Sequence, residues 1–161
     1  MIDRGDLSVE TTLESVALSQ KRILLAARRV ACPVIVATEM LHSMIASPNP
    51  TKAEVSDITN AVLDGASALM LSGETAMGAF PFEAVATMRR IVDHAAAFVD
   101  GGSTGETQEA IPSAVSDAVG LLCSRTPITK IVAVTISGYA ARMVASQLPR
   151  QPILAVSNDA E

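Results

Sequence analysis

Residues 33–39 read Pro33-Val34-Ile35-Val36-Ala37-Thr38-Glu39, an apolar run that ends in a hydroxyl and a carboxylate. Three further runs have the same continuous apolar character: Ala68-Leu69-Met70-Leu71, Lys130-Ile131-Val132-Ala133-Val134 and Pro152-Ile153-Leu154-Ala155-Val156. Continuous rather than alternating hydrophobicity is typical of strands buried on both faces of a parallel sheet. The four runs therefore predict four strands of an α/β protein.

Helical patterns separate these runs. Apolar residues recur at helical spacing from Leu13 to Ala27. Residues 51–54 have the form of a capping box that opens a second helix, and Gly65 ends it. Pro81 begins a third helix, and two more are expected over about 113–122 and 139–148 from the same spacing. Met1-Ile2 reads as the end of a further strand, which Arg4-Gly5-Asp6 breaks before a helix follows. Strands that alternate with helices predict right-handed crossovers.

Composition and charge exclude several classes of protein. The chain has 161 residues, whereas a complete (β/α)8 barrel needs about 250. A net charge of −5 argues against a nucleic-acid partner, because phosphate neutralisation needs clustered Lys and Arg. No apolar run reaches the length of a membrane span, and Asp3, Arg4 and Asp6 stand where a signal peptide would be apolar. Cys32 and Cys123 lie far apart, so reduced thiols and a cytoplasmic location are expected.

A polar, Gly-rich stretch marks the expected domain boundary. Residues 100–109 contain no apolar side chain and begin with Asp100-Gly101-Gly102-Ser103. Such a composition is typical of linkers. We therefore expect one domain over residues 1–99, a linker over 100–111 and a smaller α/β domain over 112–161.

Polar residues follow the carboxyl end of each of the first three predicted strands. Arg4-Gly5-Asp6 follows the first, Thr38-Glu39 the second and Ser72-Gly73-Glu74-Thr75 the third. Functional groups of parallel α/β folds gather at these ends, which predicts one shared site. The same residues could simply cap the helices that follow, and the sequence pattern favours neither reading over the other.

The chemistry of these side chains indicates which of them could bind a metal ion, bind an anion or pass a proton. Asp6 is the best candidate for a metal ligand, because Mg²⁺ prefers carboxylate oxygen and takes few protein carboxylates beside substrate oxygens. A lone Asp in a loop is, however, more often a helix cap. Gly5 lets the backbone approach an anion closely, and the N–H groups at a helix start favour negative charge. The hydroxyls of Thr38 and Ser72 can pass a proton or orient water, although each alone is more often a structural hydrogen bonder.

Four ordered motifs resemble the pyruvate kinase family. They are Met1-Ile2-Asp3-Arg4-Gly5-Asp6-Leu7 with Glu10; Pro33-Val34-Ile35-Val36-Ala37-Thr38-Glu39-Met40-Leu41 with Ser43-Met44; Pro50-Thr51-Lys52-Ala53-Glu54 with Ser56-Asp57, Asn60-Ala61-Val62 and Asp64-Gly65; and Met70-Leu71-Ser72-Gly73-Glu74-Thr75-Ala76 with Gly78 and Pro81. Pro112-Ser113-Ala114-Val115-Ser116 and the run from Ile131 to Val156 resemble the start of the C-terminal domain of that family. The resemblance implies an α/β fold class: the last three β/α units of a TIM (β/α)8 barrel, followed by part of a Rossmann-like C-terminal domain.

The resemblance also implies an activity, phosphoryl transfer from phosphoenolpyruvate to ADP in glycolysis, with Mg²⁺ and K⁺. Asp6 would bind Mg²⁺, and the Gly5 and Asp6 amides, in one segment with Arg4, would hold the substrate carboxylate. Thr38 would contact substrate on the face where the enolate is protonated, with Ser72 in the associated relay of hydroxyls and water. The family is generally tetrameric, so a homo-oligomer is expected.

Several positions depart from the family pattern. Asp3 stands at a usually small residue, Ser8 at a usual Gly, Glu39 at a common Gln and Met77 at a common Lys. The resemblance further implies that the strand with the catalytic Lys and a second Mg²⁺-binding Glu precedes Met1, together with the K⁺ ligands and most nucleotide contacts. We therefore expect the chain alone to be inactive.

Two alternatives stay open. The chain could be a non-catalytic binding or interaction module derived from the barrel, a reading that the departures at Asp3 and Met77 favour. A weaker alternative is another Mg²⁺-dependent barrel enzyme that acts on a phosphorylated keto acid. Co-purification with a separate N-terminal polypeptide would distinguish a split enzyme from the module.

Overall fold

The computed structural model describes residues 1–98 and 111–157. The chain divides into two compact units, Met1–Ala27 with Pro33–Phe98, and Arg28–Cys32 with Val99–Glu161. The predicted linker lies outside the described residues, apart from Ile111, which is the first residue of a helix. Strands and helices alternate along the chain, so the predicted α/β class is confirmed.

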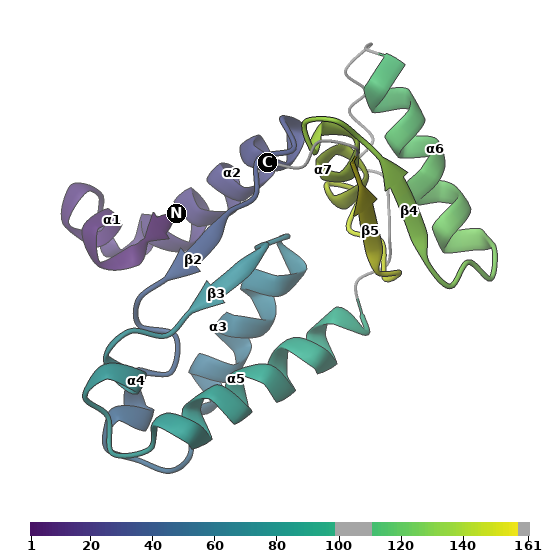
Figure 1. Ribbon diagram of the computed structural model, residues 1–161. Helices are drawn as coiled ribbons and strands as arrows, with labels where there is room; N and C mark the ends of the chain where they lie inside the picture. Colours follow the sequence, from purple (N-terminus) through teal and green to yellow (C-terminus); the bar gives the residue numbers. More distant parts are fainter. Residues whose placement is uncertain (99–110, 158–161) are drawn as a thin grey trace. The chain divides into compact units, whose positions relative to one another are not determined.

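The first unit is built on a parallel sheet with the order β1-β2-β3 (Figure 1). β1 (Ile2–Asp3) pairs with β2 (Ile35–Ala37), which pairs with β3 (Ala68–Met70). The register sets Asp3 opposite Ala37 and Ala37 opposite Met70. The carboxyl ends of the three strands therefore lie at one edge of the sheet.

Helices connect these strands and follow the last of them, and η marks a 3-10 helix. After β1 come α1 (Arg4–Glu10), η1 (Leu13–Ser15) and α2 (Val16–Arg29); after β2 come η2 (His42–Ile45) and α3 (Lys52–Leu63); after β3 come α4 (Gly73–Ala76) and α5 (Pro81–Ala96). The predicted capping box of α3 is confirmed: the Thr51 side chain accepts from the Glu54 N–H, and the Glu54 carboxylate accepts from the Thr51 N–H. Gly65 follows α3 with φ 95°, in the left-handed region that favours glycine. Neither η2 nor α4 was predicted, because one turn is too short for an apolar period.

One prediction about the first helix is wrong. Arg4-Gly5-Asp6 does not break the chain before a helix but forms the first turn of α1. The Asp3 carboxylate accepts from the N–H of Gly5 at 3.0 Å and from that of Asp6 at 3.3 Å. Aspartate is a favoured N-cap, so the helix begins directly where β1 ends.

The core of the first unit joins strand, loop and helix residues. Its buried members are Ile2, Leu24, Val34, Val36, Met40, Leu41, Met44, Ile58, Ala84 and Met88. α3 and α5 lie side by side (Figure 1). They contribute Ile58, Ala84 and Met88 to this cluster. Met40, Leu41 and Met44 follow β2 and are fully buried, which anchors the loop that carries Thr38 and Glu39.

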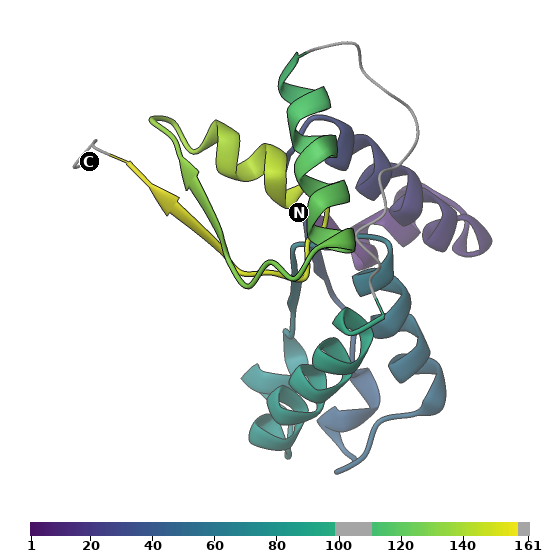
Figure 2. The ribbon, with the colours of Figure 1, turned by 90° about the vertical axis from the view of Figure 1, so that its right-hand side faces the viewer.

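The second unit contains α6 (Ile111–Arg125), β4 (Ile131–Val134), α7 (Tyr139–Ala145) and β5 (Ile153–Val156). The two strands are parallel, α7 packs against both of them, and α6 packs against α7 (Figure 2). α6 is longer than predicted at both ends, and α7 ends before Leu148.

The expectation that every strand is buried on both faces is wrong. In β2 the last two residues are buried, whereas every described residue of β5 is at least partly exposed. Val132 and Val134 of β4 are 60% and 80% exposed, and Leu154 of β5 is 58% exposed. Within the described residues, the apolar runs of β4 and β5 are therefore not buried on both faces. No helix in residues 1–98 and 111–157 is both long and apolar enough to traverse a bilayer.

Candidate functional site

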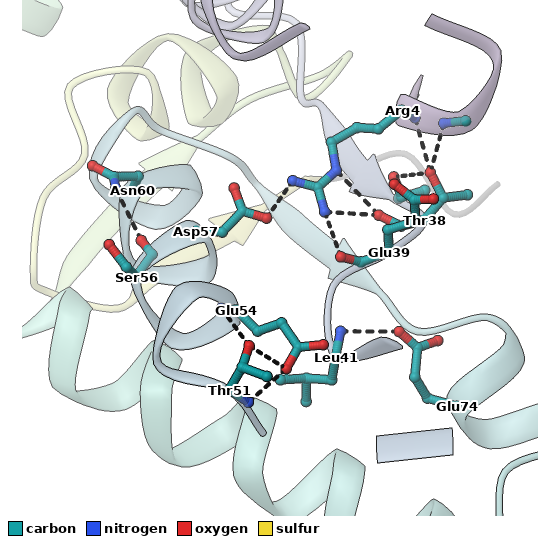
Figure 3. Close-up of polar contacts among 12 residues, drawn as sticks. Arg4, Thr38, Glu39, Leu41, Thr51, Glu54, Ser56, Asp57, Asn60 and Glu74 are labelled. Carbon is teal, nitrogen blue, oxygen red and sulfur yellow. Dashed lines mark hydrogen bonds and ion pairs between the residues drawn. The ribbon is translucent and has the colours of Figure 1, made fainter. Parts of the chain in front are cut away.

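The polar clusters at the ends of β1 and β2 are in direct contact (Figure 3). Thr38 Oγ1 accepts hydrogen bonds from the N–H of Arg4 at 2.9 Å and from the N–H of Gly5 at 3.0 Å. The same hydroxyl lies within donating distance of Asp3 Oδ1, at 3.2 Å, and of the Ala37 carbonyl oxygen, at 2.6 Å. Three of the predicted site residues, Arg4, Gly5 and Thr38, are thus brought together at one strand edge.

The Arg4 side chain extends from α1 beneath the loop that follows β2. Its Nε and Nη2 atoms donate to the Thr38 carbonyl oxygen at 3.1 and 2.8 Å, and Nη2 also donates to the Glu39 carbonyl oxygen at 2.8 Å. Nη1 forms an ion pair with Asp57 of α3. The Arg4 side chain is 10% exposed, and a charged group buried to this extent needs such partners.

Thr38 and Glu39 have an unusual backbone conformation. Their φ angles are 70° and 54°, both in the left-handed region. This region disfavours residues with a Cβ, and β-branched Thr most of all, at a cost of about 1–3 kcal/mol for each residue. Such strain persists only where neighbouring groups hold it, and Arg4 bonds both carbonyl groups of this turn.

Asp6, the predicted Mg²⁺ ligand, lies on the first turn of α1 with an exposed side chain. In the described part of the chain, no group of three or more His, Cys, Asp or Glu could enclose a metal ion. Mg²⁺ keeps several waters and commonly takes only one or two protein carboxylates. An exposed carboxylate at this edge fits one ligand position of such an ion, and these residues do not build a closed metal site.

The amides assigned by resemblance to a substrate carboxylate already have a carboxylate partner. The N–H groups of Gly5 and Asp6 both donate to Oδ1 of Asp3. The sequence identified Asp3 as a departure from the family pattern, but it did not show that this side chain caps α1. A ligand carboxylate would have to displace Asp3 to reach both amides.

Ser72 lies at the end of β3, before α4, and its hydroxyl makes no capping hydrogen bond. Capping by the Ser72 side chain, one of the two readings of this position, is therefore wrong. The Ser72 N–H donates to Glu74 Oε2 at 2.9 Å, and Glu74 Oε1 accepts the N–H of Leu41 at 3.0 Å. Thr38 and Ser72 share no hydrogen bond within the described residues, and Glu74 joins the two loops instead.

Glu74 is 2% exposed, and its carboxylate accepts the Leu41 N–H (Figure 3). Burial by itself would raise its pKa, but the N–H groups of Glu74, Leu41 and Ser72 and the nearby charge of His42 hold the pKa below its ordinary value. The ionised carboxylate therefore fastens the end of β3 to the loop after β2.

Glu54, in the first turn of α3, likewise holds a neighbouring element in place. Burial would raise its pKa, yet hydrogen bonds from Ser43 and Thr51 lower the pKa of this carboxyl below its ordinary value. The Ser43 N–H donates to Oε1 at 2.7 Å, and the Ser43 hydroxyl donates to Oε2 at 2.6 Å. The capping box thus also holds η2.

Sequence reasoning missed the roles of Asp57 and Glu74. For Asp57 a signal existed: Glu54, Asp57, Ile58 and Ala61 share one face of α3, and the last two are fully buried. Carboxylates on a buried helix face need partners, so this spacing indicates an ion pair. For Glu74 the four-residue α4 offers no such period.

Comparisons with known proteins agree with this architecture. Residues 1–85 match the family model for the pyruvate kinase barrel domain. Pyruvate kinase 2 from Synechocystis sp. is 46% identical over 158 residues, which cover 98% of this chain and 27% of that protein. The pyruvate kinase of Geobacillus stearothermophilus is 43% identical over 164 residues, with 99% and 28% covered.

A crystal structure of a pyruvate kinase from Cryptosporidium parvum matches the fold with a TM-score of 0.86 at 37% sequence identity. The match covers 97% of this chain and 33% of that one. The chain spans 27–33% of the length of these relatives. The family model covers more than half of its 161 residues. The chain belongs to the pyruvate kinase family.

Proposed function

We propose that this chain supplies part of the active site for phosphoryl transfer from phosphoenolpyruvate to ADP, which yields pyruvate and ATP. The pyruvate kinase family is a family of phosphotransferases, and the barrel-domain match over residues 1–85 includes every candidate site residue. The observation that carries the proposal is the contact of Thr38 Oγ1 with the Arg4 and Gly5 amides at the carboxyl edge of a parallel sheet.

We assign the domains on the same basis. Residues 1–99 are the last three β/α units of a (β/α)8 barrel. A linker follows, expected over 100–111 and shortened by one residue because Ile111 begins α6, and the rest of the chain is part of a Rossmann-like C-terminal domain. Sequential parallel pairing of β1, β2 and β3 supports the barrel assignment. Parallel pairing of β4 and β5, with α7 between them in the chain, supports the second.

The residues act mainly by positioning. The Gly5 and Asp6 amides bind the substrate carboxylate once Asp3 has moved aside, and Arg4 keeps the Thr38 turn in place. After the phosphoryl group has left, the hydroxyls of Thr38 and Ser72 relay a proton from water to the enolate carbon, and each hydroxyl regains from the relay the proton that it passes on. This division of labour suits phosphoryl transfer, in which positioning and charge stabilisation supply most of the catalysis.

The Asp6 carboxylate would hold Mg²⁺ through one of its oxygens. A bound Mg²⁺ neutralises charge on the phosphoryl oxygens. The second carboxylate, the catalytic Lys, the K⁺ ligands and most nucleotide contacts are assigned to segments outside residues 1–161. The chain alone is therefore expected to be inactive, and a cytoplasmic homotetramer is the expected form of the whole enzyme.

A chimeric enzyme tests this function. Residues 1–161 replace the matching segment of the Geobacillus stearothermophilus pyruvate kinase, and ATP formation from phosphoenolpyruvate and ADP is measured with Mg²⁺. Turnover within roughly a hundredfold of the parent supports the proposal, given that a misplaced active-site group alone can cost about that factor. A folded chimera with the parent's oligomeric state but no turnover would overturn it.

The capped amides at α1 favour a second candidate, a non-catalytic binding or interaction module. Asp3 occupies the donors that a substrate carboxylate would need. In that case the folded chimera stays inactive even after Asp3→Ala. Turnover that appears only in the Asp3→Ala chimera would instead show a catalytic site that Asp3 has closed.

A further inference from the structure

One guanidinium ties together three elements of the first unit. Arg4 starts α1, its hydrogen bonds reach the turn after β2, and its ion pair reaches Asp57 on α3 (Figure 3). Asp57 lies 53 positions from Arg4 in the sequence. The ion pair is thus a tertiary contact between the site and a helix that contributes no candidate site residue.

The shape of the guanidinium makes Asp57 more than a counter-charge. The group is planar, so the direction of Nη1 determines the directions of Nε and Nη2. Asp57 accepts from Nη1, while Nε and Nη2 donate to the Thr38 and Glu39 carbonyl groups. Asp57 therefore orients the donors that the turn uses.

The turn depends on these donors. Thr38 and Glu39 have φ angles of 70° and 54°, and their carbonyl groups both accept from Arg4 Nη2. In this conformation Thr38 Oγ1 lies 2.9 Å from the Arg4 amide nitrogen and 3.0 Å from that of Gly5. Released from Arg4, the turn would relax toward ordinary negative φ values, and the hydroxyl would leave the two amides.

We propose that Asp57 is a positioning residue: through Arg4 it holds the Thr38–Glu39 turn and keeps the Thr38 hydroxyl against the first amides of α1. The contacts of Arg4 with Asp57 and with the turn carry the structural part of this proposal. Its consequence for the reaction rests on the function proposed above. Asp57 touches no reacting group and acts through Arg4 alone.

A second ion pair, between Lys21 and the C-cap residue of α3, Asp64, provides a matched control. Lys21 Nζ lies 2.6 Å from Oδ1 of Asp64, which caps the C-terminal end of α3. The Asp64 side chain is 19% exposed, against 40% for Asp57, so it is the more buried of the two carboxylates. In the described part of the chain, the Lys21 ammonium donates to both carboxylate oxygens of Asp64 and makes no hydrogen bond to the Thr38–Glu39 turn. A role limited to stabilising α3 would thus make Asp64→Asn at least as disruptive as Asp57→Asn.

Amide hydrogen exchange, followed by NMR on the 161-residue chain, measures how firmly the Thr38 hydroxyl is held against the Arg4 and Gly5 amides. In Asp57→Asn the Arg4 amide, whose acceptor is Thr38 Oγ1, is expected to exchange about tenfold faster or more, since local opening releases this acceptor. The Gly5 amide also donates to Asp3 Oδ1 at 3.0 Å, so its exchange is expected to accelerate by a smaller factor. In Asp64→Asn these two amides keep their rates. The Ile58 amide of α3 keeps its rate in Asp57→Asn.

Two results would overturn the proposal. One is unchanged Arg4 and Gly5 exchange in folded Asp57→Asn, and the other is acceleration that is equal at Ile58, which would report a weakened helix. Asp57→Glu keeps the charge and is expected to restore most of the protection, and it also decides the question if Asp57→Asn fails to fold. Arg4→Lys removes the planar guanidinium. If the Arg4 amide in Asp57→Glu exchanges as fast as the residue 4 amide does in Arg4→Lys, the result counts against the proposal.

The chimera adds the functional readout. Asp57→Asn is expected to lower kcat about tenfold with little change in the KM for ADP, because a shifted hydroxyl affects the chemical step and not nucleotide binding. Asp64→Asn leaves both constants unchanged, and Asp57→Glu recovers part of kcat. Faster exchange without any change in kcat would overturn the role in the reaction. An inactive unsubstituted chimera would count against the proposed function, while the exchange rates still decide whether Asp57 holds the turn.

Discussion

The carboxylate of Glu74 accepts the N–H of Leu41 at 3.0 Å, across 33 positions of sequence. Its second oxygen accepts the N–H of Ser72 at 2.9 Å. One buried side chain thereby fixes the loop after β2 to the loop after β3, and the hydroxyls of Thr38 and Ser72 lie on those two loops. The spacing of these two proposed site residues thus depends on Glu74, which is not itself a proposed site residue.

Replacing Glu74 by Gln is expected to destabilise the first unit. An amide offers one accepting oxygen where the carboxylate offers two, so one buried N–H, of Leu41 or Ser72, loses its partner. The expected loss in the free energy of unfolding is about 1–3 kcal/mol. Urea unfolding followed by circular dichroism measures it. Glu14→Gln, at an exposed glutamate, is expected to change stability by less than about 0.5 kcal/mol, and equal losses in both variants would contradict the assignment.

The stability of the chain is expected to fall on acidification because of Glu54 and Glu74. Both pKa values lie below the ordinary 4.5 in the folded state, so the stabilisation is fully present above that value. It is lost as the pH falls below 4.5 and through the lower folded-state pKa values. Urea midpoints recorded from neutral pH down to about pH 3 test this linkage. The Glu54→Gln, Glu74→Gln double variant is expected to show a shallower decline, and an identical slope would contradict it.

Removal of the Asp3 side chain is expected to open the α1 amides to an added carboxylate. Asp3→Ala leaves the Asp6 N–H without its present acceptor, and leaves the Gly5 N–H with Thr38 Oγ1 as its remaining acceptor. Oxalate serves as the probe, with binding followed by the NMR shifts of these two amides. We expect the dissociation constant to fall about tenfold, which corresponds to about 1.4 kcal/mol.

The same variant loses a helix cap, which is expected to cost about 1 kcal/mol of stability. Asp3→Asn keeps an accepting oxygen without the charge and should bind oxalate with intermediate affinity. Oxalate shifts of equal size in the Asp3→Ala and unsubstituted chains would show that Asp3 does not compete for these amides.

Asp6 is expected to be essential for the metal-dependent reaction of the chimera. Asp6→Asn removes the charge that would bind Mg²⁺, and turnover should fall by roughly a hundredfold or more, with the Mg²⁺ concentration for half-maximal rate raised. Glu10→Gln removes a second exposed carboxylate from the same helix and is expected to leave turnover and Mg²⁺ dependence intact. Similar kinetics of the two variants would place the metal elsewhere.

Local patterns predicted most elements of the fold. The apolar run at 33–37, the capping box at Thr51 and the stop at Gly65 each depend on a few neighbouring residues, and the structure has β2 and α3 where they indicate. The run at 131–134 predicted the strand β4 but not its exposed face, because a continuous apolar run says nothing about how many layers cover it. The sequence pattern indicates a break at Arg4-Gly5-Asp6, whereas in the structure Asp3 caps α1 and the helix begins at Arg4.

The sequence by itself determined the α/β class, the strand-end clusters at Arg4, Thr38 and Ser72, and the resemblance to the family that the comparisons confirmed. Only the tertiary structure decided which groups hold those clusters. The ion pair of Arg4 with Asp57 spans 53 positions, and the bond from Leu41 to Glu74 spans 33. Hydrophobic period and capping act within a turn or two of chain, whereas these contacts arise when parallel strands bring distant loops to one edge of the sheet.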